Sequence, residues 1–380
     1  MQADIFVIDS VVHPLNMAEA NFADAKYCEP INAFVCGLLA AAPTPYAIDA
    51  AAAARDWSVD EVANLLFRES HTDVAVLHTT PIFFYKDGLS SFEKSVDAVT
   101  RYPTRFIGAY ASVDPLRPDA LQELNRQAEI LGPVKMMGLK LYPVSYQAGN
   151  FSPWYMDDPR VAFPLYERAG ELGIKNIAVH KSLPPGPAPA SAFGPQDVEG
   201  AAVAFPDLNF EIVHGGISFT EETAWLFARF PNIYINLETL NLIMALRPRV
   251  FAEILAGLLN NSGEPGIERL IWAQGAMNNH PKMCLDAFLD FNFPDDVLAR
   301  FGLYAEIPQL THKHKQMILG ENFAKQHGLQ ISDLQAAIEG DEFAAAQQAG
   351  LASPWSTTQA AETVLSRASA PAPVGVGPGA

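Results

Sequence analysis

Short apolar runs recur along the chain, and segments with helical periodicity lie between them. Each run has the length and the β-branched content of a strand that is buried on both faces. Strands of this kind belong to parallel sheets that are covered by helices. The eight predicted strands are residues 5–8, 73–77, 106–110, 137–143, 176–180, 210–214, 233–238 and 269–274.

Helical segments separate nearly every pair of these strands. Ser58 and Glu61 have the spacing of a capping box, and Gly173 and Gly328 follow helical segments at the position of a left-handed stop. The alternation of eight strands with helices predicts a (β/α)8 TIM barrel over residues 1–329. The predicted helices are 59–69, 89–102, 119–131, 159–172, 197–205, 221–230, 250–259 and 311–327.

Three segments do not follow the barrel pattern. Residues 15–58 contain several prolines and an alanine run, so we interpret them as an insertion or lid over the mouth of the barrel. Residues 330–365 are predicted to form a helical C-terminal extension. Residues 366–380 are rich in Ala, Pro and Gly and are predicted to be a mobile, disordered tail.

Two consecutive predicted strands end in a histidine, His180 and His214. The carboxyl ends of the strands form the mouth of a (β/α)8 TIM barrel, where active sites are built. Two histidines in this position are difficult to explain by packing alone. The residues predicted at the mouth are His13, His78, Lys140, His180, His214, Glu238 and the segment 274–280.

Imidazole and carboxylate groups at one barrel mouth favour a metal site. They are ligands for zinc, iron, manganese or nickel. A single histidine at a strand end is usually a packing residue, whereas three or more that converge indicate a metal. The histidines expected on the surface instead are His71, His312, His314 and His327.

Composition narrows the class of protein. The chain has 380 residues, of which 49% are hydrophobic and 18% charged, and its net charge is −18. This charge argues against nucleic acid and anionic membranes as partners. Cys28, Cys36 and Cys284 have no CxxC spacing, which argues against disulfides and structural zinc. Without a signal peptide or a long apolar run, the chain is predicted to be cytoplasmic.

Five motifs in order along the chain resemble the amidohydrolase superfamily, most closely its branch of aminocarboxymuconate-semialdehyde decarboxylase-like enzymes. The resemblance covers about residues 4 to 329. The motifs are Val7-Ile-Asp-Ser-Val-Val-His-Pro14, Gly138-Leu-Lys-Leu-Tyr-Pro143, Ala178-Val-His180, Ile212-Val-His-Gly-Gly216 and Ile318-Leu-Gly-Glu-Asn-Phe-Ala-Lys325.

The resemblance implies a mononuclear metal site for which His13, His180 and His214 match family positions. Two family positions differ. Val11 replaces the first histidine of the Ile-Asp-x-His-x-His motif, and the strand-eight aspartate is missing around Gly275. In the family, that aspartate binds the metal and handles the proton of the attacking water. Loss of an anionic ligand weakens a divalent site and raises the pKa of bound water.

Three compensations for the missing ligands are open. Glu238 is one source of a carboxylate, His280 or Asn278 is another source of a ligand, and Lys140 is a candidate for a carbamate. Three of these residues also have a purely structural interpretation. Lys140 could be a solvated or ion-paired lysine, and Glu238 could form an ion pair with Lys140 or with Lys181. His280 could be an ordinary loop histidine.

Three functions follow from this pattern. The first is a metal-dependent amidohydrolase-like enzyme that hydrolyses or decarboxylates a small carboxylate-bearing substrate. Its predicted metal ligands are His13, His180, His214, Glu238 and His280, and its predicted catalytic residues are His214 and Lys140. Zinc is the first expectation for the divalent transition metal, with iron and manganese as alternatives.

The second hypothesis is an altered-site subunit of a hetero-oligomeric, metal-dependent oxygenase or hydroxylase of the same superfamily. The third is a non-catalytic protein that binds a small acid. A homo-oligomer, or a hetero-oligomer with a homologous chain, is expected in either of the first two cases.

Overall fold

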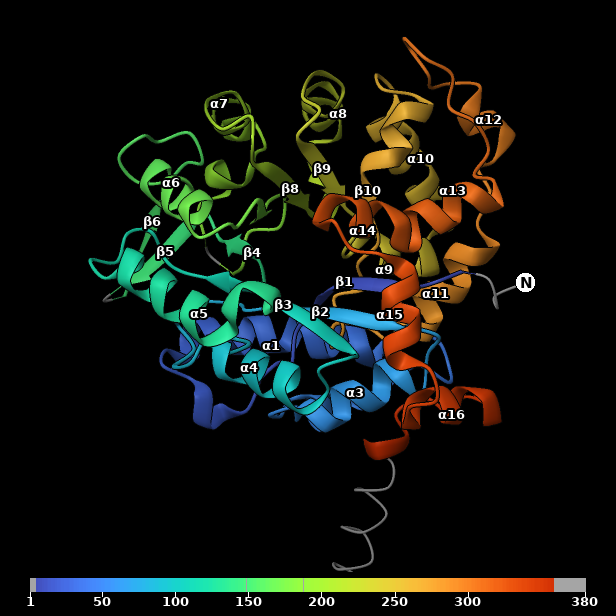
Figure 1. Ribbon diagram of the computed structural model, residues 1–380, viewed down its shortest axis with the longest axis horizontal. Coiled ribbons are helices and arrows are strands. Elements are labelled where there is room, and N and C mark those ends of the chain that lie inside the picture. Colours follow the sequence, from blue (N-terminus) through green and yellow to red (C-terminus); the bar gives the residue numbers. More distant parts are fainter. Residues whose placement is uncertain (1–4, 148, 187, 359–380) are drawn as a thin grey trace, which may run out of the picture.

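The computed structural model describes residues 5–147, 149–186 and 188–358, and it contains the predicted (β/α)8 barrel (Figure 1). Eight parallel strands form one sheet in the order β1-β2-β3-β4-β7-β8-β9-β10. They are β1 (Ile8–Val12), β2 (Val74–His78), β3 (Phe106–Ser112), β4 (Met136–Leu141), β7 (Asn176–His180), β8 (Asn209–Val213), β9 (Ile233–Asn236) and β10 (Leu270–Ile271).

Backbone contacts between β1 and the segment after β10 close the barrel. Val12 forms a parallel bridge with Ala276, and the amide of His13 donates to the carbonyl of Ala276 at 2.7 Å. The amide of Gly275 donates to the carbonyl of Val11 at 3.0 Å. The first and last strands thus bring His13 and Gly275 to the same side of the mouth.

Helices surround the strands (Figure 1). They are α1 (Ala25–Ala40), α2 (Ala50–Ala53), α3 (Val59–Phe67), α4 (Phe92–Arg101), α5 (Ala120–Lys135), α6 (Phe163–Glu171), α7 (Asp197–Ala204), α8 (Thr220–Arg229), α9 (Leu240–Leu246), α10 (Pro248–Leu259), α11 (Pro281–Asp290), α12 (Asp295–Leu298), α13 (His312–Gln316), α14 (Asn322–His327), α15 (Ile331–Ile338) and α16 (Glu342–Ala349). A π-helical turn, Met317–Glu321, joins α13 to α14.

The strands are buried on both faces, as their apolar sequences predict. Ile8, Val76 and Tyr110 belong to a core cluster whose buried side chains come from seven of the eight strands, and a second, larger cluster joins strands to helices. Alternate residues of each strand pack into the barrel interior and against the surrounding helices, because successive side chains point to opposite faces of the sheet. The interior layer forms the floor beneath the mouth.

Several predicted boundaries are confirmed and others shift. Ser58 and Glu61 form the predicted capping box, and Gly173 and Gly328 both have positive φ, 79° and 64°. The first strand begins at Ile8 rather than residue 5, and the eighth pairs only over Leu270–Ile271. The sequence did not predict the hairpin of β5 (Val144–Gln147) and β6 (Asn150–Pro153), whose strands are short and partly exposed.

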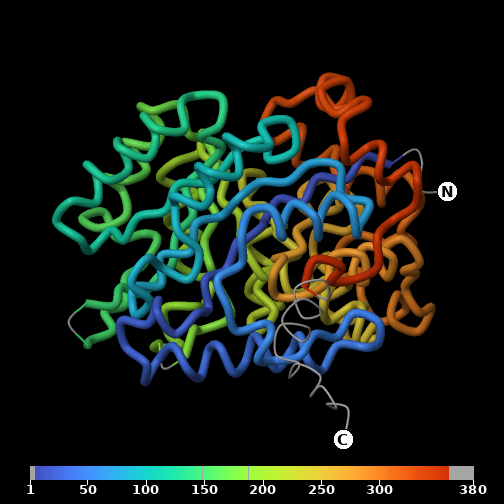
Figure 2. The backbone as a smooth tube through the Cα atoms, turned by 90° about the horizontal axis from the view of Figure 1, so that it is seen from below, coloured from blue at the N-terminus to red at the C-terminus, as the bar shows by residue number. Residues whose placement is uncertain are grey.

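The segment between β1 and β2 lies along one face of the barrel, as the dark-blue tube in Figure 2 shows. Its main element is α1, which lines a cavity at the mouth with residues such as Ile31, Phe34 and Leu38. This position is compatible with the predicted lid, and the division of the chain at residues 15–58 stays a prediction.

Helices α15 and α16 form the described part of the predicted C-terminal extension. Residues 359–365 and the predicted tail, 366–380, lie outside the described residues. The predicted surface position is confirmed for His312, which is exposed, whereas His71 is half-buried. The prediction is wrong for His314, which is buried and pairs with Glu264, and for His327. The ring of His327 is hydrogen-bonded to Tyr110 and Asn176 below the barrel interior, where the closing helix packs.

Glu69 ties the end of the described chain to the barrel. Its carboxylate is 1% exposed and accepts hydrogen bonds from the backbone amides of Trp355 (2.7 Å) and Ser356 (2.9 Å). It also pairs with His280 at 3.1 Å. The Glu69 carboxylate thus joins the C-terminal segment to the loop after β10. Trp355 extends this connection to the 15–58 segment, because its indole donates to the carbonyl of Tyr46.

The three cysteines are buried and free, as predicted. Within the described part of the chain, no helix is long and apolar enough to cross a membrane. The cytoplasmic location stays a prediction.

We expect Glu69→Gln to lower the free energy of unfolding by about 2 kcal/mol at pH 7, because hydrogen bonds to a charged group contribute about 1.5–3 kcal/mol. Burial opposes ionisation of Glu69, but its bonds to His280, Ser356 and Trp355 outweigh burial and lower its pKa from 4.5. A depressed carboxyl pKa stabilises the fold above the unfolded pKa, and this contribution disappears as pH falls through the folded value.

Urea denaturation between pH 3 and pH 7 measures both effects. The variant should lose less stability than the parent on acidification below about pH 4.5. Glu342→Gln is the control, because Glu342 is exposed and pairs with Arg68 at the surface, where ion pairs contribute about 0–1 kcal/mol. Equal losses in the two variants would show that Glu69 does not hold the segments together.

Candidate active site

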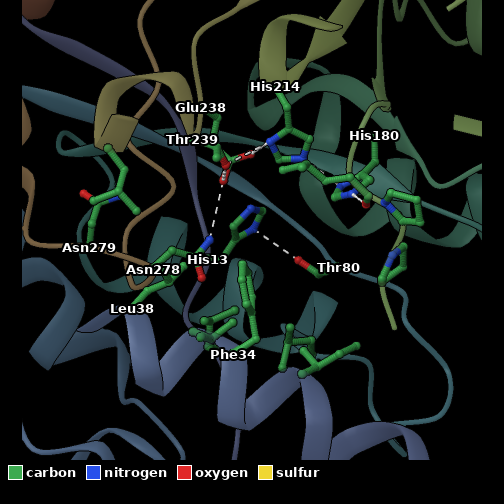
Figure 3. Close-up of a pocket in the computed structure, with 18 of the residues that line it drawn as sticks. His13, Phe34, Leu38, Thr80, His180, His214, Glu238, Thr239, Asn278 and Asn279 are labelled. Atoms are coloured by element: carbon green, nitrogen blue, oxygen red, sulfur yellow. Dashed lines mark hydrogen bonds and ion pairs between the residues drawn. The ribbon is translucent and has the colours of Figure 1, made fainter. Parts of the chain in front are cut away.

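A cavity of about 870 Å³ opens at the carboxyl ends of the strands. Its floor is polar and its walls are apolar (Figure 3). The polar floor consists of His13 after β1, Thr80 after β2, Tyr142 after β4, His180 at the end of β7, His214 after β8, Glu238 and Thr239 after β9, and Asn278 and Asn279 after β10. The structure therefore brings together His13, His180, His214 and Glu238 from the predicted set.

Three residues just after neighbouring strands adopt an unusual backbone conformation, and two of them, His214 and Thr239, line the cavity. Ser182, His214 and Thr239 follow or end strands β7, β8 and β9 and have φ of 74°, 67° and 68°. A left-handed conformation costs a non-glycine residue about 1–3 kcal/mol and is concentrated at functional sites. Three such residues at neighbouring strand ends support a functional role for this mouth.

His214 lies at the centre of a hydrogen-bonded chain. Its Nδ1 is 2.7 Å from Oε2 of Glu238, and its Nε2 is 2.9 Å from Nδ1 of His180. Nε2 of His180 in turn donates to the carbonyl of Leu183 at 2.6 Å. Since that carbonyl only accepts, Nδ1 of a neutral His180 carries a lone pair, and His214 must then donate to both of its partners.

Glu238 is the anion of this chain. The carboxylate is 3% exposed, and burial alone would raise its pKa. The charge and hydrogen bond of His214, with further contributions from His13 and Lys140, outweigh burial and hold the pKa well below the usual range. Glu238 therefore stays ionised at neutral pH.

His13 and His180 each have one ring nitrogen fixed by the backbone. Nδ1 of His13 lies 2.7 Å from the carbonyl of His78 and 3.1 Å from Oγ1 of Thr80. Burial, together with the charges of Lys140 and His214, lowers the pKa of His13 to about 4 although Glu238 opposes the shift. Burial also lowers the pKa of His180, so both rings are neutral at pH 7.

Gly275 provides the room that Glu238 occupies. Gly275 has φ of 63°, and a Cβ built on it would overlap the Glu238 carboxylate. This is the region of strand eight where the sequence lacks the expected aspartate. The structure thus has a carboxylate from β9 in contact with the position that a strand-eight side chain would occupy.

Lys140 lies in the interior layer near this floor without lining the cavity. It is 1% exposed, and its Nζ is 5.4 Å from the centre of the Tyr142 ring. Burial lowers its pKa from 10.5 to about 8, against the attraction of Glu238 and Glu211. The alternative pairing of Glu238 with Lys181 does not occur, because Lys181 is buried in an ion pair with Asp197 at 2.7 Å.

His280 lies apart from the other predicted ligands. Its ring is fully buried against Tyr46 and Trp355 and pairs with Glu69. Asn278, on the same loop, does line the cavity, with its Nδ2 3.5 Å from Oε1 of Glu238. His78 is buried below the floor and stacks on Tyr110 at 4.2 Å.

The donor types at the floor suit a divalent transition metal. His13 and His180 are neutral, and each has one ring nitrogen on a backbone carbonyl, as in metal-binding histidines. Glu238 supplies an anionic oxygen. Among residues 5–147, 149–186 and 188–358, however, no group of three His, Cys, Asp or Glu side chains is arranged to hold an ion as it stands. Nδ1 of His180 is bonded to His214, so coordination requires that bond to open.

The sequence suggested an apolar-walled pocket, from branched and aromatic residues of the 15–58 segment and from Phe83-Phe84-Tyr85, but it did not identify part of the floor. Thr239 and Asn279 carry no pattern that separates them from ordinary loop residues. The wall on α1 did have a signal, because Ile31, Phe34, Val35 and Leu38 have the spacing of one helix face.

We expect Gly275→Ala to destabilise the protein by about 2–4 kcal/mol, from the left-handed backbone and from displacement of the Glu238 carboxylate. Gly328→Ala is the matched control, because Gly328 has φ of 64° and no atom within 4 Å of a built Cβ. It should cost about 1 kcal/mol. Urea denaturation of both variants measures the difference, and equal costs would contradict the close contact with Glu238.

Comparisons with known proteins agree with this architecture. The family profile described as Amidohydrolase matches residues 43–325. No match was found among curated proteins. A solved, uncharacterised TIM-barrel protein from Bordetella bronchiseptica is 18% identical, with a TM-score of 0.57, over 85% of this chain and 100% of that chain.

Two further solved structures are similar in fold. The 5-carboxyvanillate decarboxylase of Novosphingobium aromaticivorans, complexed with manganese and 4-hydroxy-3-methoxy-5-nitrobenzoic acid, is 14% identical over 86% of this chain and 97% of that chain, with a TM-score of 0.51. An amidohydrolase of Burkholderia multivorans with bound zinc is 12% identical over 86% and 100% of the two chains, with a TM-score of 0.50. Since the family profile spans most of the barrel, the chain belongs to the amidohydrolase family.

Proposed function

We propose that this protein is a metal-dependent enzyme of the amidohydrolase family that removes carbon dioxide from a carboxylate-bearing substrate. The observation that carries the proposal is the hydrogen-bonded chain of Glu238, His214 and His180 on the floor of the cavity, beside the free nitrogen of His13. Hydrolysis is the other reaction that the sequence allows. The lack of a strand-eight aspartate makes it the less favoured one, because that group handles the proton of the attacking water in the family.

In this proposal, His13, His180 and Glu238 hold a divalent metal, with His214 next to it. The metal, when bound, supplies a Lewis acid that polarises oxygen atoms of the substrate. One of the two similar solved structures holds manganese and the other zinc, and the metal proposed for this chain is zinc, iron or manganese.

His214 is the proposed proton donor. Loss of carbon dioxide leaves an electron pair on the carbon that carried the carboxylate, and this carbon must take up one proton. Nε2 of His214 faces the floor of the cavity, and Glu238 orients the ring through Nδ1 and balances its positive charge. His214 then regains a proton from water that enters through the mouth, so one proton is consumed for each carbon dioxide released.

Lys140 is the proposed electrostatic support of this step. A cationic side chain in the interior layer attracts the negative charge of the substrate toward the floor. The same position supports the alternative of a carbamate on Lys140, which would add an oxygen ligand.

Two observations favour a second function. Among the described residues, no three His, Cys, Asp or Glu side chains are arranged to bind a metal ion. In addition, Val11 occupies the first histidine position of the family motif. A homologous partner chain that carries the working metal centre would account for both features. Co-purification of this chain with such a partner supports the alternative, and a homogeneous, active preparation of the chain alone contradicts it.

We expect about one equivalent of a transition metal in the protein purified from rich medium, measured by mass spectrometry. His180→Ala should reduce it below about a tenth of an equivalent, because one of few ligands is lost. His312→Ala, a change of the same kind at an exposed histidine, should keep the metal. Less than a tenth of an equivalent in the parent, with no gain after reconstitution, would exclude the metal-dependent function.

We expect Lys140→Met to raise the free energy of unfolding at pH 7 by up to about 3 kcal/mol while it abolishes turnover, because burial lowers the Lys140 pKa from 10.5 to about 8. A depressed lysine pKa is a cost to folding below the folded value, and this cost disappears as pH rises from about 8 to about 10.5. The advantage of the variant should therefore disappear over the same range.

Urea denaturation at pH 7, 9 and 10.5 measures this difference between Lys140→Met and the parent. Lys26→Met, at an exposed lysine on α1, is the control and should change stability little at any of these values. A variant that is less stable than the parent at pH 7 would show that Lys140 is a stabilising ion-pair partner.

A further inference from the structure

The walls of the cavity are apolar far beyond the polar floor. Three segments form them: one face of α1, the loop at 183–186 and the helix α9. The apolar side chains that carry the argument are Ile31, Phe34, Leu38, Leu183, Leu242 and Leu246. Among the described residues that line the cavity, Arg247 at the rim is the one lysine or arginine.

Phe34 indicates that this wall is available to contact a ligand and is not part of the buried core. It lines the cavity, and yet 67% of its surface is exposed. An exposed phenylalanine is unfavourable in water, and its burial against an apolar ligand is favourable. Figure 3 shows Phe34 and Leu38 on the α1 side of the cavity, facing the floor with His214 and Glu238 from the opposite side. A ligand that spans this distance contacts both.

The size of the cavity points in the same direction. Its volume of about 870 Å³ lies near the upper end of the range of roughly 300–1,000 Å³ for ligand pockets. An acid with a single ring, placed on the polar floor, leaves the wall of α1 and α9 uncovered. The small substrate that the sequence suggested therefore does not use most of the cavity.

We infer that the substrate is an amphiphilic acid whose polar head lies on the floor and whose hydrocarbon body, larger than one benzene ring, extends between α1 and α9. The position of the head rests on the proposed function. The position of the body rests on the apolar wall alone.

The test uses uncharged 1-alkanols from pentanol to octanol, because their binding does not need a metal or a charged floor. We expect the affinity, measured by isothermal titration calorimetry, to rise by about threefold for each added methylene, or about 30-fold across the series. Phe34→Ser should reduce the affinity for octanol by about tenfold and change that for pentanol by less than twofold. Val134→Ser is the control, since Val134 is 81% exposed on α5 and does not line the cavity.

Two results would overturn the inference: an affinity that does not increase with chain length, or an effect of Phe34→Ser on octanol no larger than that of Val134→Ser. Because Phe34 is largely exposed, the variant is expected to fold, and circular dichroism checks this. Leu246→Ser, on the opposite wall, should weaken octanol binding in the same way.

A parallel titration with the carboxylates from hexanoate to nonanoate separates the two proposals. Alkanols that gain affinity with length, while the carboxylates do not bind, would support the apolar body and contradict the proposed polar head. Carboxylates that bind equally at every length would support the head and contradict the body.

Discussion

The buried carboxylate of Glu238 is the constraint on which the candidate site depends. A negative charge in a nearly enclosed position is stable only with close positive or hydrogen-bonding partners. His214 provides the nearest of these at 2.7 Å, and Lys140 and His13 contribute to the same field. His214 and Thr239 adopt a left-handed backbone beside this carboxylate. Gly275 leaves the space that the carboxylate occupies.

The arrangement also explains how a chain of the amidohydrolase family retains an acidic group in its mouth. The resemblance leads us to expect a carboxylate after strand eight, whereas this chain has Gly275 in that region and a carboxylate after β9 that occupies the space above it. The two positions depend on each other, because a side chain at 275 would displace Glu238. The carboxylate of Glu238 lies beside His214, where, in the proposed function, it supports proton delivery to the substrate.

The sequence was sufficient to predict the barrel, because eight doubly buried strands leave continuous apolar runs and their intervening helices have a distinct period. It also predicted that His13, His180, His214 and Glu238 share one mouth, since topology places all strand ends together. The direction of a loop side chain does not follow from topology. His280 has the residue type and position of a ligand, yet its ring turns toward Glu69. An apolar wall was expected from the 15–58 segment, but the side chains of α1 that form it did not follow from the sequence, because α1 contacts the mouth only through tertiary packing.

The most direct measurement is a crystal structure of the protein soaked with manganese, with an anomalous difference map at the manganese edge. We expect one peak on the floor of the cavity, within bonding distance of Nε2 of His13, Nδ1 of His180 and an oxygen of Glu238, with the bond between His180 and His214 opened. A map without a peak there, or with manganese bound elsewhere while Glu238 keeps its bond to His214 alone, would contradict the proposed metal site.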